Sequence, residues 1–267
     1  MVTTTRDGAQ PKILVASEWL DEHAGHPAVK IVDVRSAEAY AEGHIPGAIS
    51  LPLATLQTFR DGTPEMLVQQ PEFEAHVGQL GIHATDTVVL YDNMWAMPAA
   101  RVLWALERYG HQDARILDGG IDGWEAEGRP LTTNPPALSP ANYHAAPADQ
   151  RVASHDWLVA HLDDPHIVIV DTRTPQEYHQ GHVPGAINWD WMNAVPDNSP
   201  AALRPAAELR SELVALGVTP DKEIVAYCRS GARSSHFYFA LRHLGYPRVR
   251  NYDGSWLAWS VKETCRE

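Results

Sequence analysis

The segment CRSGARSS, residues 228–235, holds the residue types that make a thiol reactive. The nucleophilic form of cysteine is the thiolate, and nearby positive charges favour that ionised form. Arg229 and Arg233 place two permanent cations within a few residues of the Cys228 sulfur. Gly231 lets the chain adopt a backbone conformation that is closed to other residues. We therefore interpret Cys228 as a nucleophile in a loop that binds anions.

The alternative is that Cys228 is inert. A free cysteine at the end of a strand is more often a small apolar residue of the core, without reactivity. That interpretation leaves the two arginines, the glycine and the start of a helix around the cysteine unexplained. We therefore favour the reactive thiol and expect its sulfur to lie among amide and guanidinium groups. A sulfur surrounded by hydrocarbon alone would contradict this interpretation.

Two elements are expected to hold this loop. The apolar run IVAY, which ends at Tyr227, predicts a buried strand, and a helix is expected to begin near Ser234 or Ser235. Ligands of parallel sheets bind beyond the carboxyl ends of the strands, which is where Cys228 lies. The amides of such a turn and the partial positive charge of the helix N-terminus both stabilise an anion. The predicted position thus suits a thiolate.

The chain contains this arrangement twice. The segment IVDVRSAEAYAEGHIPGAI, residues 31–49, aligns without a gap with IVDTRTPQEYHQGHVPGAI, residues 169–187, and VVLYD is matched further on by IVAYC. The period is much longer than that of a solenoid, so it indicates two copies of one domain. We predict an N-terminal domain over residues 1–128, a C-terminal domain over 151–267, and between them a proline-rich, extended linker over 129–150 that is not a packed element.

Each copy alternates short apolar runs with longer segments of helical periodicity. VKIVDV and TVVLYD suit buried strands, and PAARVLWALERYG suits a helix that ends at a glycine. This alternation predicts an α/β fold in which each domain is a mainly parallel sheet flanked by helices.

The composition excludes several classes of protein. With 267 residues, 44% of them hydrophobic, the chain can bury a sizeable core, and its net charge of −13 provides no broad basic surface for nucleic acid or anionic membranes. No apolar run approaches the roughly 18 residues of a membrane span. The 14 histidines show no paired spacing with cysteine that would bind zinc. We expect no metal, no nucleic acid and no membrane partner.

The cysteine count indicates the redox setting. Two cysteines are too few for a framework of disulfides, and the N-terminus lacks the apolar core of a signal peptide. We therefore expect a reducing, cytoplasmic setting. Cys265 stands close to the C-terminus, where an exposed position is the default. Its spacing does not establish a role as a resolving thiol for Cys228.

The doubled DxR…Y…GHxPGAI block, the CRSGAR loop and the YDGSW segment together resemble the rhodanese superfamily, in the tandem form of the thiosulfate and 3-mercaptopyruvate sulfurtransferases. The resemblance covers nearly the whole chain, from Ile13 to Trp259. It implies that Cys228 accepts a sulfur atom as a persulfide, without a cofactor, and passes it to a thiophilic acceptor. The residues that it implies for binding the substrate are Arg229, Ser230, Gly231, Ala232, Arg233 and Arg173.

The first copy departs from this pattern at the reactive position. Asp92 occupies the place of Cys228, and a carboxylate cannot carry a persulfide. The resemblance therefore implies an inactive N-terminal domain packed against a catalytic C-terminal one. We interpret Asp92 as a carboxylate that either is exposed to solvent or caps the helix that follows it. Arg35 occupies the place of Arg173, so a role of this arginine in folding stays open beside contact with substrate.

Three further residues are candidates for the site. His44 and His182, in the two GHxPGAI segments, are interpreted as structural. Whether Asp92 or His44 contributes to the active site is left open. Trp95, in the loop that contains Asp92, is expected to face the cleft.

Arg229 favours thiosulfate as the sulfur donor, because capture of a compact dianion requires cations close to the reactive sulfur. In the family, thiosulfate enzymes tend to carry basic residues in the loop, whereas mercaptopyruvate enzymes tend to have glycine and then serine after the cysteine. Ser230 stands where the thiosulfate enzymes of animals have lysine, so 3-mercaptopyruvate remains the alternative. We predict a monomeric thiosulfate sulfurtransferase that releases sulfite and passes sulfur to cyanide or to a thiol such as thioredoxin or glutathione.

Two other functions are less favoured. Cell-cycle tyrosine phosphatases share this architecture, but their loop has five residues between cysteine and arginine, whereas four separate Cys228 from Arg233. A smaller ring of amides suits a single sulfur atom better than a phosphoryl group. The second is a noncatalytic rhodanese-like module, and the retention of Cys228 with both arginines argues against it.

Overall fold

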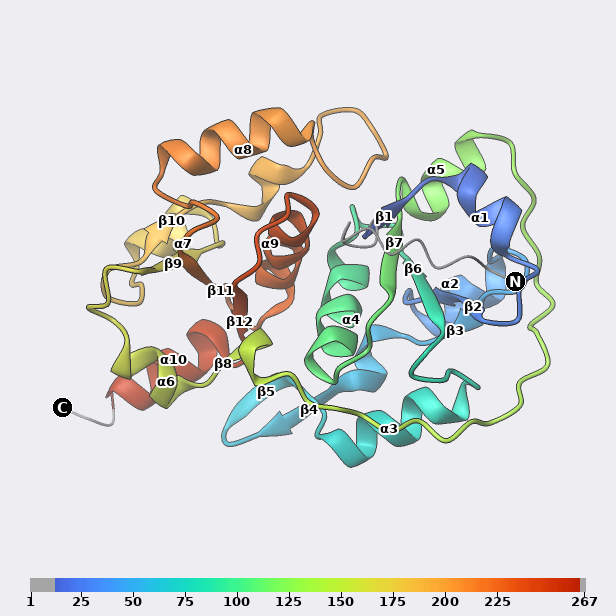
Figure 1. The fold of residues 1–267 in the computed structure, drawn as a ribbon, viewed down its shortest axis with the longest axis horizontal. Coiled ribbons are helices and arrows are strands. Elements are labelled where there is room, and N and C mark those ends of the chain that lie inside the picture. Colours follow the sequence, from blue (N-terminus) through green and yellow to red (C-terminus); the bar gives the residue numbers. More distant parts are fainter. Residues whose placement is uncertain (1–12, 265–267) are drawn as a thin grey trace.

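The computed structural model describes residues 13–264 and shows two domains of the same architecture side by side (Figure 1). Within these residues, each domain is built on a five-stranded sheet whose paired strands are all parallel. The predicted α/β fold with mainly parallel sheets is therefore confirmed. Cys265 lies outside the described residues.

The two sheets have equivalent strand orders, β1-β7-β6-β2-β3 and β8-β12-β11-β9-β10. The N-terminal sheet consists of β1 (Leu14–Val15), β2 (Val29–Asp33), β3 (Ile49–Ser50), β6 (Thr87–Tyr91) and β7 (Ala114–Leu117). The C-terminal sheet consists of β8 (Val152–Ala153), β9 (Ile167–Asp171), β10 (Ile187–Asn188), β11 (Glu223–Tyr227) and β12 (Val249–Tyr252). The register repeats as well, since Asp33 pairs with Tyr91 and Asp171 pairs with Tyr227.

Helices flank each sheet, and the central strands are continuously apolar because both of their faces are covered. The N-terminal domain contains α1 (Ser17–His23), α2 (Ala37–Glu42), η1 (Leu53–Leu56), α3 (Gln70–Gln79), α4 (Met97–Arg108) and α5 (Gly120–Ala126). The remaining helices are η2 (Asp149–Arg151), α6 (His155–Ala160), α7 (Pro175–His179), η3 (Trp191–Ala194), α8 (Ala206–Ala215), α9 (Ala232–His243) and α10 (Ser255–Thr264).

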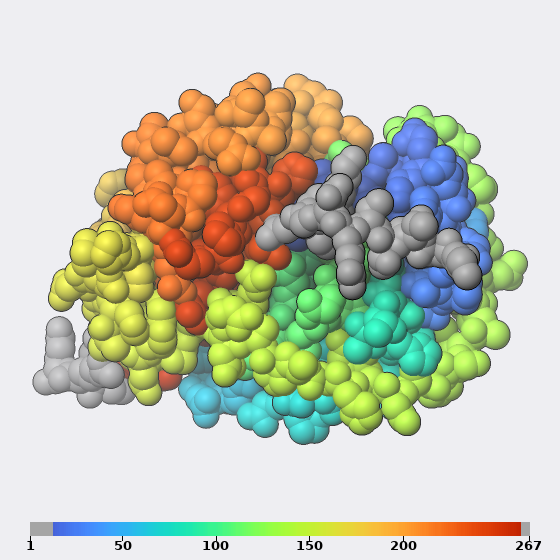
Figure 2. Space-filling view, in the orientation of Figure 1, coloured from blue at the N-terminus to red at the C-terminus, as the bar shows by residue number. Residues whose placement is uncertain are grey.

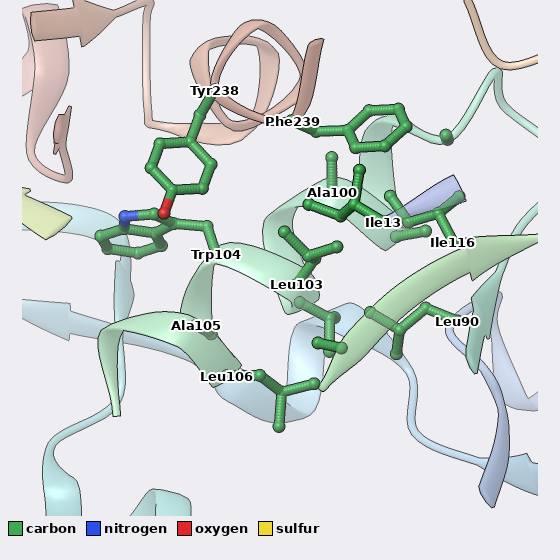
Figure 3. Close-up of a cluster of buried hydrophobic side chains, with 14 of the residues drawn as sticks. Ile13, Leu90, Ala100, Leu103, Trp104, Ala105, Leu106, Ile116, Tyr238 and Phe239 are labelled. Atoms are coloured by element: carbon green, nitrogen blue, oxygen red, sulfur yellow. The ribbon is translucent and has the colours of Figure 1, made fainter. Parts of the chain in front are cut away.

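The two domains share one hydrophobic core. Helices α4 and α9 pack against each other across the domain boundary. In Figure 3, Tyr238 and Phe239 of α9 face Ala100, Leu103 and Trp104 of α4, and all five side chains are buried. The space-filling view shows the C-terminal domain, in orange and red, packed directly against the N-terminal domain (Figure 2). A shared apolar core of this kind fixes one domain against the other.

A hairpin of the N-terminal domain also reaches across the boundary. Strands β4 (Gln57–Arg60) and β5 (Thr63–Leu67) are antiparallel, and β5 contacts α10. The Leu67 N–H donates to the carboxylate of Asp253, 3.1 Å away, in the turn between β12 and α10. The hairpin therefore adds a polar contact to the apolar interface.

The linker is extended, but the expectation that it does not pack is wrong. In Figure 1 it runs down the outer side of the N-terminal domain and past α3. The Tyr143 side chain is buried, and a Cβ added to Gly110 would lie 2.2 Å from the Ala146 carbonyl oxygen. Because Gly110 has no side chain, the linker backbone approaches the domain closely enough for the Ala146 N–H to donate to Tyr109 O.

Candidate active site

Cys228 follows β11 directly, at the carboxyl end of the central strand of the C-terminal sheet. Helix α9 begins at Ala232, so the predicted start near Ser234 or Ser235 is wrong. The reason is Gly231, which occupies the N-cap position with a left-handed φ of 90° and turns the chain at once into the helix. The loop is therefore tight, and the cysteine lies close to the first turn of α9.

The Cys228 sulfur is buried among polar groups. The residue is 1% exposed, yet the Gly231 N–H donates to Sγ at 3.1 Å and the Ser234 hydroxyl oxygen lies 3.6 Å from Sγ. Both groups belong to the start of α9, where the free amides carry partial positive charge. The sulfur is thus not enclosed by hydrocarbon alone. This arrangement is one that stabilises a thiolate.

The start of helix α10 is hydrogen-bonded to the cysteine loop. The Cys228 N–H donates to the Ser255 hydroxyl at 3.2 Å, and the Cys228 carbonyl accepts from the Trp256 N–H at 3.0 Å. The Arg229 carbonyl accepts from the Leu257 N–H at 3.1 Å. These backbone contacts fix where Cys228 points. In the first copy the equivalent residue is Gly120, which has no hydroxyl group.

A buried polar cluster is hydrogen-bonded to the loop at Gly231. The Gly231 carbonyl accepts from the Ser235 hydroxyl at 2.7 Å and from Asn251 Nδ2 at 3.1 Å. Ser234 Oγ lies 2.7 Å from Asn251 Oδ1. Asn251 was missed by the sequence analysis. The signal was an amide side chain inside the otherwise buried strand β12.

The two loop arginines have different partners. Arg229 is exposed, and its guanidinium makes no ion pair with any residue that the structure describes. Arg233 donates to both carboxylate oxygens of Glu177, at 2.7 and 2.8 Å. That bond is the main reason why the pKa of Glu177 falls to about 2. Glu177 thus neutralises one of the two predicted cations, and of the two loop arginines only Arg229 lacks an ion pair among the described residues.

The Arg233 guanidinium also interacts with the charge of Cys228. Burial lowers the pKa of its guanidinium, but the hydrogen bonds to Glu177 and the negative charge of Cys228 raise it above its usual value. Of the other loop residues, Ser230 is largely buried and Ala232 is half-buried in the first turn of α9. Of the predicted loop residues, Gly231 therefore contacts the sulfur directly and Arg233 interacts with its charge, whereas contact of the others with substrate stays a prediction.

Arg173 lies in a different environment. It is 3% exposed, and its Nε and Nη2 donate to the carboxylate of Asp171 and its Nη2 also to the Gly181 carbonyl. Arg35 makes the same bonds to Asp33 and Gly43 in the domain that lacks the cysteine. This shared arrangement favours the folding role that was set beside substrate contact. Contact of Arg173 with substrate stays a prediction.

Asp92, the counterpart of Cys228, uses its carboxylate to bind its own loop. It accepts the N–H groups of Met94, Ala96 and Ala99 at 2.7, 3.0 and 2.8 Å, and Ala99 lies in the first turn of α4. Asp92 thus caps an amide of α4, although Ala96 occupies the N-cap position, and the alternative of a solvent-exposed carboxylate is wrong because Asp92 is buried. Burial raises the pKa of this carboxyl group. In the first copy the amide cradle is filled by a side chain of the protein.

The remaining candidates lie apart from the cysteine loop. His44 is buried, stacks on Tyr40 at 3.8 Å between ring centres, and contacts the carbonyl oxygens of Tyr40 and Asn134. His182 stacks on Tyr178 in the same way, at 3.9 Å. These contacts agree with a structural role for both histidines.

Trp95 and Asp92 line a cavity of about 270 Å³, which Ser199, Pro200 and Ala202 of the C-terminal domain also line. The side chain is 44% exposed. The expectation that Trp95 faces the active cleft is therefore wrong, because the cavity that it lines belongs to the copy without the cysteine.

Across residues 13–264, no group of three or more His, Cys, Asp and Glu side chains is arranged to hold a metal ion. No helix in the same part of the chain is long and apolar enough to cross a membrane.

Known proteins are similar to this chain in sequence and in fold. A family model described as the rhodanese-like domain matches residues 16–127 and 154–262. The thiosulfate sulfurtransferase of Azotobacter vinelandii is 35% identical over 95% of this chain and 96% of its own. The sulfur carrier protein TtuD of Thermus thermophilus is 37% identical, with 94% of each chain covered. The structure of the 3-mercaptopyruvate sulfurtransferase SseA from Escherichia coli matches with a TM-score of 0.83 at 28% identity, over 92% of this chain and 99% of that one.

Proposed function

The chain belongs to the rhodanese family, with two rhodanese-like domains in tandem, and on that basis we propose that it transfers sulfane sulfur through a persulfide on Cys228. The activity is that of a thiosulfate sulfurtransferase. The observation that carries the proposal is the buried Cys228 sulfur, which accepts a hydrogen bond from the Gly231 amide at the carboxyl end of β11.

The reaction consists of two half-reactions on one sulfur atom. The Cys228 thiolate attacks the outer sulfur of thiosulfate, the sulfur–sulfur bond of the donor breaks, and sulfite leaves with the electron pair. The acceptor, cyanide or a thiolate, then attacks the outer sulfur of the persulfide. That step forms thiocyanate or a new persulfide and restores the Cys228 thiolate. Each half-reaction breaks one sulfur–sulfur bond and forms one new bond to the transferred sulfur, which is a carbon–sulfur bond when cyanide is the acceptor, so neither step needs a further oxidant or reductant.

Each loop residue has a proposed part in these steps. The Gly231 amide and the Ser234 hydroxyl hold the reacting sulfur of Cys228. The exposed guanidinium of Arg229 meets the charged end of the donor and eases the departure of sulfite. Ser230, Ala232 and Arg233 line the loop around the substrate, with Arg233 sharing its charge with Glu177.

3-Mercaptopyruvate is the second candidate donor. The observation that favours it is the Arg233–Glu177 pair, because pairing leaves Arg229 as the one loop guanidinium without an ion pair in the described structure. A single cation suits a monocarboxylate as well as a dianion. The likeness to SseA supports the same alternative. A phosphatase remains less favoured, since four residues and not five separate Cys228 from Arg233.

The acceptor, the oligomeric state and the location belong to the same proposal. A persulfide transfers its sulfur to thiols, so thioredoxin and glutathione are suitable acceptors. The catalytic domain already has a partner in the N-terminal domain of its own chain, which supports a monomer. A cysteine that must remain a free thiolate supports a reducing, cytoplasmic location.

Steady-state kinetics of Cys228→Ser test this function. With thiosulfate and cyanide, the wild-type protein is expected to form thiocyanate and sulfite, and the variant is expected to form neither. Thiocyanate formation by the variant at the wild-type rate would end the assignment of Cys228 as the nucleophile. Parallel assays with 3-mercaptopyruvate decide between the two donors.

A further inference from the structure

Arg101 is a buried cation that the N-terminal domain presents to the catalytic domain. It is the fifth residue of α4 and is 1% exposed. Its Nη2 donates to the carboxylate of Asp253, in the catalytic domain, and to the Glu65 carbonyl at 3.2 Å. Its Nη1 is buried and has no hydrogen-bond partner among the described residues. A buried donor without a partner is costly, so its position requires an explanation.

The unpartnered Nη1 lies against the cysteine loop. A Cβ added to Gly231 would lie 2.7 Å from Arg101 Nη1 and 2.9 Å from the Asp253 carbonyl oxygen. Gly231 is the residue whose N–H holds the Cys228 sulfur. The guanidinium group is therefore packed against the backbone that places the nucleophile.

Asp253 is itself fixed by the N-terminal domain. Besides Arg101, its carboxylate accepts from the Leu67 N–H at 3.1 Å and lies 3.7 Å from Arg60 Nη2. Helix α4 and the β4–β5 hairpin thus both contact Asp253, in the turn that lies next to Gly231. Two sets of contacts therefore position the cysteine loop: those of Arg101 and Asp253, and those of Asn251 with Ser234 and Gly231.

The repeat shows that the arrangement is specific to the cysteine loop. His236 is the fifth residue of α9, as Arg101 is of α4, and it too is buried at the domain boundary. Backbone groups of Trp95 and Ala202 face its imidazole, so His236 meets the loop of Asp92. Burial lowers the pKa of His236 to about 4, which keeps it neutral. A permanent cation faces the loop with the thiol, and a neutral ring faces the loop with the carboxylate.

We infer that Arg101 is a positioning residue for the reaction: held by Asp253, its guanidinium braces Gly231 and so fixes the amide that binds the Cys228 sulfur. The inference rests on the proposed role of Cys228 as the nucleophile. It gives the domain that lacks the cysteine a part in sulfur transfer. Loss of Arg101 leaves Gly231 free to shift, and a small misplacement of a reacting group is enough to slow a reaction strongly.

The test compares Arg101→Met and Arg101→Lys with the matched control Glu107→Gln. Glu107 also lies on α4 and crosses the domain boundary, where it accepts from the Tyr238 hydroxyl and from Arg242, but it makes no contact with the cysteine loop. Two readouts are measured on the full chain. One is the steady-state rate with thiosulfate and cyanide. The other is the pH dependence of alkylation of the Cys228 peptide by iodoacetamide, followed by mass spectrometry.

Arg101→Met is expected to lower kcat/KM by about tenfold or more and to move the alkylation profile to higher pH, because the thiolate loses a well-placed amide donor. Arg101→Lys is expected to lie between Arg101→Met and the wild type. Glu107→Gln is expected to lower the melting temperature while it leaves both readouts at the wild-type values. This pattern separates positioning of the loop from general loosening of the interface.

Equal effects of Arg101→Met and Glu107→Gln, or an unchanged alkylation profile in Arg101→Met, would overturn the inference. If Arg101→Met does not fold, a wild-type rate and profile in Arg101→Lys would overturn it equally well. Failure of the proposed function is distinguishable, because alkylation does not require sulfur transfer. If the wild-type protein showed no transferase activity while Arg101→Met still shifted the alkylation profile, the proposed function would be refuted and the positioning role of Arg101 would stand.

Discussion

Replacing Glu177 by glutamine releases a cation beside the cysteine loop. In the wild-type protein both carboxylate oxygens of Glu177 accept from Arg233. Glutamine at this position still has a side-chain oxygen for the capping box with Thr174, so α7 should persist. The variant removes the charge of the pair and leaves the guanidinium next to Cys228 free to bind a donor.

The pKa of Glu177 sets the size of the effect on stability. Its hydrogen bonds to Arg233 lower the pKa from 4.5 to about 2. At about 1.4 kcal/mol for each pKa unit, the full shift corresponds to about 3 kcal/mol. The Glu177 side chain is 31% exposed. Solvent screening reduces the expected loss in the variant to about 1 kcal/mol.

The pH dependence has a definite sign. Because the pKa of Glu177 is lowered in the folded protein, its contribution to stability is present above pH 4.5 and is lost as the pH falls toward 2. Urea denaturation should therefore show Glu177→Gln less stable than the wild type at pH 7. The difference between the two proteins should shrink as the pH approaches 3, and a constant difference would contradict the lowered pKa.

Kinetics test the effect on the substrate. The freed Arg233 guanidinium is expected to lower KM for thiosulfate about fivefold, equivalent to about 1 kcal/mol for one exposed charge contact. The matched control is Glu212→Gln, which removes a carboxylate bonded to Arg204 in the same domain at 2.7 Å. The control should lose stability and keep its KM. An unchanged or higher KM in Glu177→Gln would refute the argument that Glu177 masks a substrate-binding charge.

Three further predictions concern the two copies of the loop. Arg229→Gly is expected to raise KM for thiosulfate about tenfold while it affects 3-mercaptopyruvate less; equal effects on the two donors in steady-state assays would remove the basis for preferring thiosulfate. Gly231→Ala is expected to cost about 2 kcal/mol of stability and to abolish transfer, since φ is 90° and the methyl group would lie 2.7 Å from Arg101 Nη1; a stable variant with normal kinetics would contradict this. Asp92→Ala is expected to lower the free energy of unfolding by about 2 kcal/mol, because three amides lose their acceptor, with little change in transferase kinetics; urea denaturation with an unaltered midpoint would contradict the cap.

The fold was predictable because its signals are local and repeated. Continuous apolar runs predicted strands that are covered on both faces, and the doubled block predicted two equivalent sheets. The position of Cys228 between a strand and a helix was predictable for the same reason, since the strand, the cysteine and the glycine are neighbours in sequence. The start of α9 was placed too late, because the apolar periodicity does not reveal that Gly231 caps the helix.

The contacts that tune the loop could not be predicted, because they join residues far apart in the chain. Glu177 reads as a surface residue of a short helix, yet it neutralises Arg233, 56 positions away. Arg101 lies within the predicted helix PAARVLWALERYG, and nothing in its neighbouring residues indicates that its partner is Asp253, 152 positions away. The packing of the linker depends on Gly110, whose missing side chain matters only where another backbone approaches it.

The most direct test of the central claim is the mass of the protein after treatment with thiosulfate in the absence of an acceptor. The account predicts the gain of one sulfur atom, located on the peptide that contains Cys228, with release of an equal amount of sulfite. A mass without added sulfur, or added sulfur found on the Cys265 peptide alone, would contradict it.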